Sequence, residues 1–264
     1  MKKILTLTVL TTLFGFIAQA SAEDASAIME KAHLASYYAA NDGKAKVHME
    51  IINPDGGKRI REFTILRKDV ADGGDQWFYV YFDKPNDVRD MTFLVNKHPK
   101  ADDDRWLFIP AIKMVKRIAA SDSRAAFVGS DYTYEDISGR HPSADNSEFV
   151  GTEELNGRKS WVIKNTPKTP VDDYAWRKTW VDQESNLVMK ESYYDDAGTE
   201  VRRFTTTEFK KFGNFWIGMA GVMENLELNH KTTVQFSDVA LDVGIPDSVF
   251  TERSLKSAPK RWVR

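Results

Sequence analysis

The chain has 264 residues, and its 39 acidic and 37 basic side chains give a net charge of −2, which argues against nucleic acid as a partner. It contains no cysteine, which excludes disulfides, a thiol nucleophile and cysteine-based metal sites. Aromatic residues make up 12% of a chain with 29% charged residues, and this combination indicates either a dense core or an apolar binding cavity.

The N-terminus has the three parts of a secretory signal peptide. Lys2 and Lys3 form a basic region, residues 4–18 are apolar, and residues 20–22 (ASA) have the small-x-small pattern that signal peptidase cuts. The apolar part is too short to be a good membrane span. We expect cleavage after Ala22 and export of a soluble protein to a bacterial periplasm. The alternative is an uncleaved N-terminal anchor.

One helix and about a dozen strands are predicted in the exported part of the chain. The helix covers Asp24 to Ala40, with Asp24 as its cap and an apolar face, and residues 41–43 (NDG) end it. The predicted strands are 44–53, 58–68, 76–83, 88–97, 105–109, 113–118, 147–155, 158–165, 175–182, 187–194, 201–212, 215–228 and 231–236. This hairpin spacing is typical of an antiparallel sandwich or barrel, and it excludes a Rossmann-type site, which needs alternating strands and helices.

So many strands must form a curled sheet. More than about eight strands curled around themselves leave interior space that side chains alone do not fill. The polar stretch 143–147 could mark a boundary, but strands resume directly after it. We therefore predict one domain over residues 23–264.

The predicted strand 76–83 is aromatic on both faces. One face carries Trp77, Tyr79 and Tyr81, and the other carries Phe78, Val80 and Phe82. A strand with two apolar faces is buried on both sides. A helix could cover one face and a ligand the other; the alternative is a two-sided core.

A basic and apolar segment follows the turn at Pro110 and Ala111. Its basic side chains are Lys113, Lys116 and Arg117, and the apolar ones among them are Ile112, Met114, Val115 and Ile118. One hypothesis is a basic rim at an apolar mouth that meets lipid headgroups. The simpler interpretation is a solvated edge strand, on which lysine commonly prevents pairing with another sheet.

Residues 129–136 (GSDYTYED) are the most distinctive string in the sequence. Their acidic side chains could suggest a cation site, but the alternating acidic positions and closing glutamate of an EF-hand loop are missing. Thr133 and Asp136 fit a capping box, so we favour a structural turn. The five histidines show no zinc-binding spacing, and the sequence has no nucleophile elbow and no P-loop. No catalytic residue, metal ligand or cofactor is predicted.

Two central strings carry a resemblance to a known family. Residues 106–118 (WLFIPAIKMVKRI) and 127–136 (FVGSDYTYED) resemble the signature of the outer-membrane lipoprotein-sorting protein family, whose fold is LolA-like. The likeness covers nearly the whole exported chain. It implies a mainly β fold: an antiparallel meander curled into an unclosed half barrel whose concave face is covered by helices. This chain departs from that pattern, because it has an N-terminal helix and few further segments that could form covering helices. The signature residues, to which we assign a structural role, are Gly129, Ser130, Asp131, Tyr132, Tyr134, Glu135 and Asp136.

The resemblance implies a non-enzymatic periplasmic carrier or chaperone. It would bind lipid or lipoprotein acyl chains in the barrel cavity, where burial gains about 0.8 kcal/mol per methylene, and deliver them toward the outer membrane. The expected cavity residues are Phe63, Ile65, Trp77, Tyr79, Tyr81, Trp106, Phe108, Trp176 and Trp180. Expected protein partners are an inner-membrane RND-type transporter or an outer-membrane acceptor.

Three other functions compete with the carrier. The strongest is a non-enzymatic periplasmic adaptor of an RND-type lipid exporter or envelope complex. An outer-membrane barrel is disfavoured because neither face of residues 201–209 is apolar throughout. A hydrolase is disfavoured because no nucleophile–base motif appears.

The predicted processing gives a direct test. We expect the exported protein to begin at Glu23, because residues 20–22 place the cleavage site after Ala22. Intact-mass measurement of protein from the periplasmic fraction decides this. A membrane-bound chain that retains Met1 would contradict it.

Overall fold

The structure, a computed structural model, describes residues 22–71 and 73–264. The helices are α1 (Ala22–Tyr37), α2 (Tyr134–Ser138), α3 (Glu252–Lys256) and α4 (Lys260–Val263). The strands are β1 (Asp42–Ile52), β2 (Lys58–Asp69), β3 (Gln76–Lys84), β4 (Thr92–Lys97), β5 (Asp104–Ile109), β6 (Met114–Ile118), β7 (Asp145–Leu155), β8 (Arg158–Pro167), β9 (Trp176–Asp182), β10 (Val188–Tyr194), β11 (Glu200–Phe212), β12 (Phe215–Asn225) and β13 (His230–Leu241). The predicted signal peptide, except for Ala22, lies outside the described residues.

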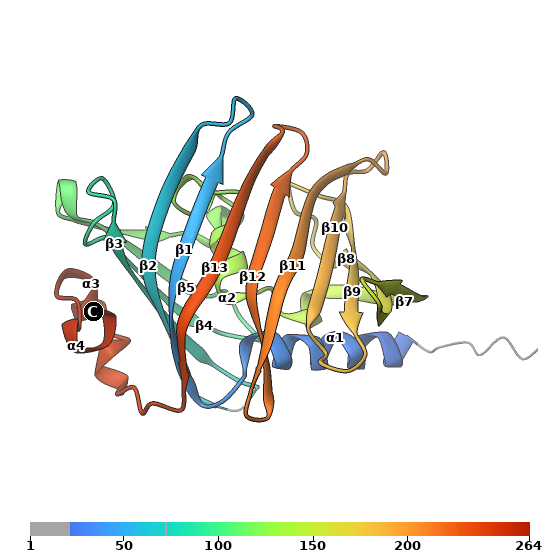
Figure 1. Cartoon of the computed structure of the whole chain (residues 1–264), viewed down its shortest axis with the longest axis horizontal. Coiled ribbons are helices and arrows are strands. Elements are labelled where there is room, and N and C mark those ends of the chain that lie inside the picture. Colours follow the sequence, from blue (N-terminus) through green and yellow to red (C-terminus); the bar gives the residue numbers. More distant parts are fainter. Residues whose placement is uncertain (1–21, 72) are drawn as a thin grey trace, which may run out of the picture.

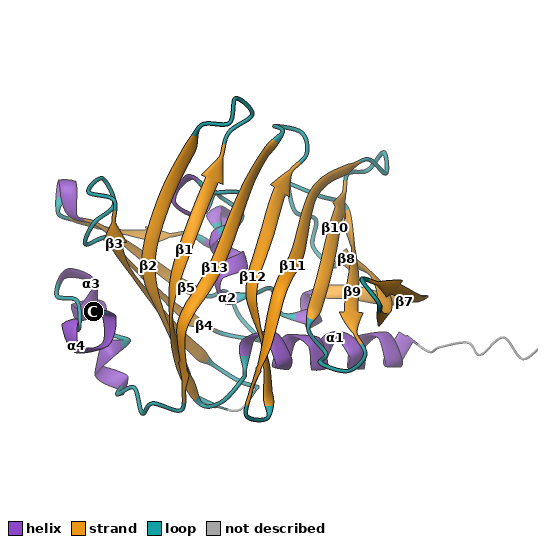
Figure 2. Cartoon of the chain, viewed as in Figure 1, coloured by secondary structure: helices purple, strands orange, loops and turns teal. Residues whose placement is uncertain are grey.

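All the strands belong to one curved antiparallel sheet (Figure 1 and Figure 2). Its order is β6-β5-β4-β3-β2-β1-β13-β12-β11-β10-β9-β8-β7, so neighbours in space are neighbours in sequence except where β1 pairs with β13. Strands β6 and β7 are the two edges and do not pair with each other. The prediction of an unclosed, mainly β meander with an N-terminal helix is therefore confirmed.

The chain between β6 and β7 has to cross from one edge of the sheet to the other. This connecting segment (residues 119–144) contains α2 and lies against the concave face of the sheet (Figure 1). The predicted capping box is confirmed here. The Thr133 amide donates to the Asp136 carboxylate over 2.7 Å, and the Asp136 amide donates to the Thr133 hydroxyl over 3.2 Å.

Helix α1 covers another part of the concave face. Ala25, Met29 and Ala32 are buried and pack against Ile163 of β8 and Val181 of β9. Small alanines let the helix lie close to the sheet. The helix already includes Ala22 and ends at Tyr37, so both predicted ends lie a few residues too far along the chain. Among the residues that the structure describes, none of the helices has both the length and the apolar character needed to cross a bilayer.

The opposite, convex face of β2 to β6 is covered by the C-terminal segment (residues 242–264), which contains α3 and α4 (Figure 1). These two short helices were not predicted. A hydrophobic cluster joins Leu66, Tyr79 and Leu94 of the sheet to Phe250 and Leu255 of this segment. Strand β3 is thus buried on both faces, as its two aromatic faces predict. On each side the cover is protein.

The main core lies on the concave side, where the connecting segment meets β1 to β5. Phe127 is fully buried at its centre. Its ring lies 5.5 Å from Phe93, 5.8 Å from Phe82 and 5.8 Å from Tyr134, measured between centroids. This aromatic contact fastens the connecting segment to the sheet.

Removal of this aromatic ring should destabilise the whole fold. We expect Phe127→Ala to lower the free energy of unfolding by about 3–5 kcal/mol, because it leaves a cavity in a packed core. Urea denaturation followed by circular dichroism measures the change. The control Leu228→Ala alters a side chain that is 65% exposed and should change stability by about 0.5 kcal/mol or less. Equal effects of the two variants would contradict this assignment of the core.

Candidate functional site

A cavity of about 380 Å³ lies between α1, the connecting segment and the concave face of the sheet. Its volume falls within the range of about 300–1,000 Å³ that is typical of small-molecule sites. The apolar side chains that line it come mainly from the central strands. They include Val47, Met49, Phe63, Ile65, Phe78, Phe204, Ile217, Met223, Val234, Phe236, Val239 and Leu241.

Small residues on β12 keep this part of the cavity open. Gly218, Ala220 and Gly221 all line it. A Cβ atom on Gly221 would lie only 2.9 Å from the ring of Phe204, a contact that would displace the ring. The ring of Phe204 in turn lies 6.4 Å from that of Tyr132 in the connecting segment. Glycine at position 221 therefore determines the position of the Phe204 ring in the cavity wall.

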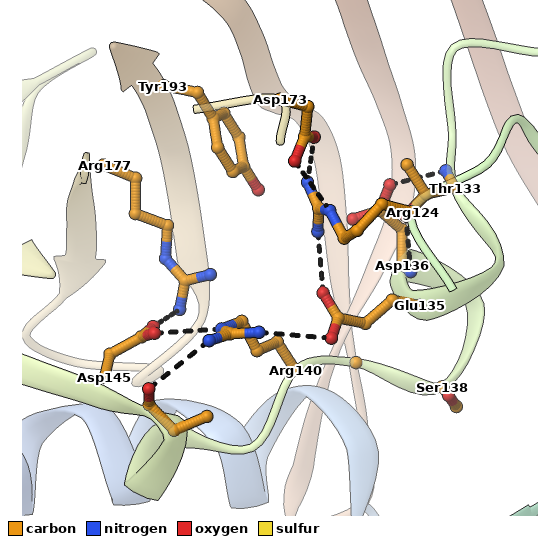
Figure 3. Close-up of polar contacts among 12 residues, drawn as sticks. Arg124, Thr133, Glu135, Asp136, Ser138, Arg140, Asp145, Asp173, Arg177 and Tyr193 are labelled. Carbon is orange, nitrogen blue, oxygen red and sulfur yellow. Dashed lines mark hydrogen bonds and ion pairs between the residues drawn. The ribbon is translucent and has the colours of Figure 1, made fainter. Parts of the chain in front are cut away.

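The other end of the cavity is lined by three arginines, Arg124, Arg140 and Arg177, which pair with carboxylates (Figure 3). The Arg124 guanidinium lies 2.7 Å from Glu135, and the Arg140 guanidinium lies 3.3 Å from the same carboxylate. Asp145 then joins Arg140, at 2.9 Å, to Arg177 of β9, also at 2.9 Å. The pairs form a continuous chain from the connecting segment to the sheet.

A second buried pair joins the connecting segment to β11. Asp136 forms an ion pair with Arg202. Burial acts to raise the pKa of Asp136, but Arg202 and Arg124 outweigh it, and the pKa lies below its usual value. Burial also acts to raise the pKa of Glu135, but the charges of Arg124 and Arg140 outweigh it, and this pKa too lies below its usual value. Both carboxylates therefore stay charged at neutral pH and keep their partners.

Two further contacts fix the ends of α2. The Asp131 carboxylate accepts a hydrogen bond from the Thr232 hydroxyl of β13 over 2.6 Å and lies 2.8 Å from His230 Nδ1. Beyond the helix, the Lys97 ammonium of β4 donates to the Gly139 carbonyl. Burial lowers the pKa of Lys97. Within residues 22–71 and 73–264, no group of three or more histidine or acidic side chains is arranged to hold a metal ion.

The signature residues make contacts of this structural kind. Asp131, Glu135 and Asp136 are the anchors just described, and the Ser130 hydroxyl donates to the Phe127 carbonyl over 2.7 Å. Gly129 has a left-handed φ of 75°. Tyr134 packs in the Phe127 core, and only Tyr132 and Asp136 of the signature reach the cavity wall.

The nine predicted cavity residues divide between the two faces of the sheet. Phe63 and Ile65 line the cavity. The others do not, and for them the prediction is corrected. On the convex face, the residues that pack with the C-terminal segment are Trp77, Tyr79, Tyr81, Trp106 and Phe108. Trp176 stacks on Tyr194 at 4.0 Å, and Trp180 donates to Glu153 of β7.

Sequence reasoning chose the wrong alternate set because both sets are aromatic. On β3 the inward set is Phe78, Val80 and Phe82, one residue out of step with the predicted one. On β9 the outward side of Trp180 is covered by Lys178 and Lys190, whose ammonium groups lie 4.7 Å and 4.5 Å from its ring centroid. The lining from α1 and from β11 to β13 was missed entirely, although alternation along 231–236 was a usable signal.

His33 of α1 also lines the cavity, and its Nε2 atom is buried without a hydrogen-bond partner. The residue is 5% exposed. Its ring lies 5.3 Å from the ring of Tyr37 and 5.1 Å from that of His141. Burial, helped by the positive charge of Lys97, lowers the pKa of His33 to about 3. This histidine is therefore neutral in the folded protein.

Comparison with known proteins connects this geometry to a family. A family model for an uncharacterized protein matches residues 74–257. The crystal structure of a DUF1329 family protein from Desulfovibrio piger is 26% identical, with a TM-score of 0.80 over 89% of this chain and 97% of that one. A putative outer membrane lipoprotein-sorting protein domain from Vibrio parahaemolyticus is 25% identical, with a TM-score of 0.82 over 89% and 100%.

A more distant structure shows the same fold. A LolA superfamily protein from Nitrosomonas europaea is 18% identical, with a TM-score of 0.66 over 87% of this chain and 98% of that one. No curated protein sequence matches the chain. The resemblance to lipoprotein-sorting proteins and the LolA-like fold are thus confirmed.

The neutral His33 makes stability depend on pH. Its pKa is lowered on folding, so the unfolded state binds more protons below pH 6.5 and stability falls as the pH falls toward 3. Between pH 7 and pH 5 we expect His33 to cost about 2 kcal/mol of unfolding free energy. Urea denaturation at the two pH values should show a smaller loss for His33→Gln than for the natural chain. The control His48→Gln changes a half-buried ring that does not line the cavity and should keep the full loss. A full loss in both variants would contradict the assignment.

Proposed function

We propose that this chain, which belongs to the family of uncharacterized proteins whose model matches residues 74–257, is a periplasmic carrier. It binds an acyl chain of a lipid or lipoprotein in the concave cavity and delivers it toward the outer membrane. The observation that carries the proposal is the sheltered apolar cavity of about 380 Å³. The similar Vibrio parahaemolyticus domain, a putative lipoprotein-sorting protein, supports the same function.

The physical basis of binding is burial without chemistry. Each methylene removed from water contributes about 0.8 kcal/mol, so a sheltered apolar wall can compete with a membrane for an acyl chain. Met29, Met49 and Met223 lie in that wall, and methionine side chains adapt to irregular ligands. At the opposite end the charged side chains pair with one another, so the apolar part of the wall is the surface that binds the acyl chain.

Delivery requires reversible opening, and α1 is the cover best suited to move. Its buried contacts with β8 and β9 come from Ala25, Met29 and Ala32. Two of these three side chains are single methyl groups, so separation of the part of the helix before His33 exposes little apolar area, while buried His33 and the Tyr37 ring against the main core hold its last turn. The connecting segment, by contrast, is held by the Phe127 core and by buried ion pairs. Opening at α1 therefore costs less than displacement of the connecting segment.

A matched pair of variants on β2 tests the cavity. Ile65 lines it, whereas Ile60 on the same strand is 42% exposed. Ile65→Glu would place an unpaired carboxylate in an apolar site at a cost of several kcal/mol, so we expect affinity for a fluorescent fatty acid to fall by about tenfold or more. Ile60→Glu should bind as the natural chain does.

The readouts are fluorescence titration and native mass spectrometry, with circular dichroism to show that both variants are folded. The natural chain should carry a lipid-sized adduct after mild extraction from cells. A folded natural chain with no adduct and no response to the fatty acid would contradict the carrier function. That outcome would favour the adaptor of an exporter or envelope complex.

A further inference from the structure

One end of the molecule carries a turn with exposed apolar side chains between basic ones. The turn joins β5 to β6 through a short 3-10 helix, Pro110–Ile112, and Lys113 follows in a left-handed conformation with φ of 51°. Ile112 is 60% exposed and Met114 is 47% exposed. Large apolar side chains grouped at an exposed turn mark a contact with another surface more often than scattered ones do.

The C-terminal segment adds a group of cations. Residues 251–264 contain five basic side chains and one acidic side chain, in a chain whose net charge is −2. Arg253, Lys256, Lys260 and Arg261 are all exposed. No ion pair within residues 22–71 and 73–264 involves any of these four or Lys113 and Lys116. Their charges are therefore directed to solvent.

These cations stand on a fixed surface. The Tyr79 hydroxyl of β3 donates to the Ser254 carbonyl over 2.7 Å, and the Thr92 hydroxyl of β4 donates to the Leu255 carbonyl over 2.8 Å. The Thr64 hydroxyl of β2 donates to the Val263 carbonyl over 3.1 Å. Each helix of the segment is thus tied to the convex face of the sheet.

The turn and the C-terminal segment are continuous with each other. Val115 of β6 packs against the same hydrophobic cluster as Leu255 and Val263. Figure 1 shows the green β5–β6 turn and the red helices α3 and α4 at one end of the molecule. The basic side chains of the two elements therefore lie at the same end of the molecule as the exposed Ile112 and Met114.

We propose that this end is a docking surface for a bilayer of anionic phospholipid. The exposed lysines and arginines would contact lipid phosphates, and Ile112 and Met114 would enter the headgroup region. Each basic side chain near an anionic surface strengthens binding by about fivefold. The complementary charge and the apolar tip are the two features that interfacial binding combines.

Protection of an edge strand against pairing with another sheet explains only part of this surface. Lysine on β6 would block pairing with another sheet, and β6 is an edge. Such protection does not require exposed Ile112 and Met114. It also does not account for the cations of α3 and α4, which are not on a strand. Because the docking surface lies outside the concave cavity, it does not depend on the proposed carrier function.

Vesicle flotation tests the proposal with the purified exported protein. The vesicles are phosphatidylethanolamine with phosphatidylglycerol, or phosphatidylcholine alone. We expect binding to the anionic vesicles only, with a decrease as salt is raised. The triple variant Lys256→Glu, Lys260→Glu, Arg261→Glu should bind at least 100-fold more weakly, at about fivefold or more per reversed charge. The double variant Ile112→Ser, Met114→Ser should weaken the binding that the natural chain retains at high salt, because the apolar contact contributes most of the binding there.

The matched control reverses three exposed lysines elsewhere in the sheet: Lys159→Glu, Lys210→Glu and Lys211→Glu. It changes the net charge equally and should keep most of the binding. Equal losses in the two triple variants, or equal binding to neutral vesicles, would overturn the proposal. Both triple variants should bind the fluorescent fatty acid as the natural chain does, which separates this result from a failure of the carrier function.

Discussion

The structure depends on how the connecting segment is held against an unclosed sheet. Strands β6 and β7 are opposite edges, so the 26 residues between them (119–144) must cross the concave face rather than turn back beside it. Buried ion pairs hold this crossing, with Asp136 bound to Arg202 and Asp145 shared between Arg140 and Arg177. Loss of one partner from such a pair typically costs about 3–5 kcal/mol, because it leaves an uncompensated buried charge. The same pairs fix the polar end of the cavity, so the position of the segment and the shape of the site have one cause.

The sequence predicts the sheet well because each strand and turn is a local signal. Alternating side chains and turn residues set the hairpins, and the Thr133–Asp136 capping box needs only four consecutive residues. The start of β4 was placed too early, at Val88, because buried Val88 and Met91 belong to the turn before the strand. That turn is apolar since it packs in the core, and hydrophobicity alone cannot distinguish it from a strand.

The candidate site was less predictable because it depends on pairs far apart in the sequence. Asp131 with Thr232 and Asp136 with Arg202 are 101 and 66 residues apart, and no local pattern links them. The inward face of β3 was equally hidden, because Phe78 and Tyr79 are both apolar enough for a core. A shift of one residue exchanges the two faces. The face of β3 that carries Tyr79 is decided by the C-terminal segment, which covers it. The sequence of that segment is too irregular to suggest that it covers the sheet.

For a carrier, this division of the concave face limits what can bind. Phe127 and its aromatic neighbours fill the space beside Phe82 and Phe93, whereas the space lined by β1, β2 and β11 to β13 retains the cavity. A ligand that fits the existing cavity requires movement only of the part of α1 before His33, whose contacts with β8 and β9 come from Ala25, Met29 and Ala32. A ligand with several acyl chains would have to displace the connecting segment and separate its buried ion pairs from the sheet. Displacement of the segment would also expose the Phe127 core, which buries more apolar surface than the alanines of α1 do. The arrangement therefore favours a single acyl chain over a bulkier ligand, and the ion pairs that stabilise the fold also set the capacity of the site.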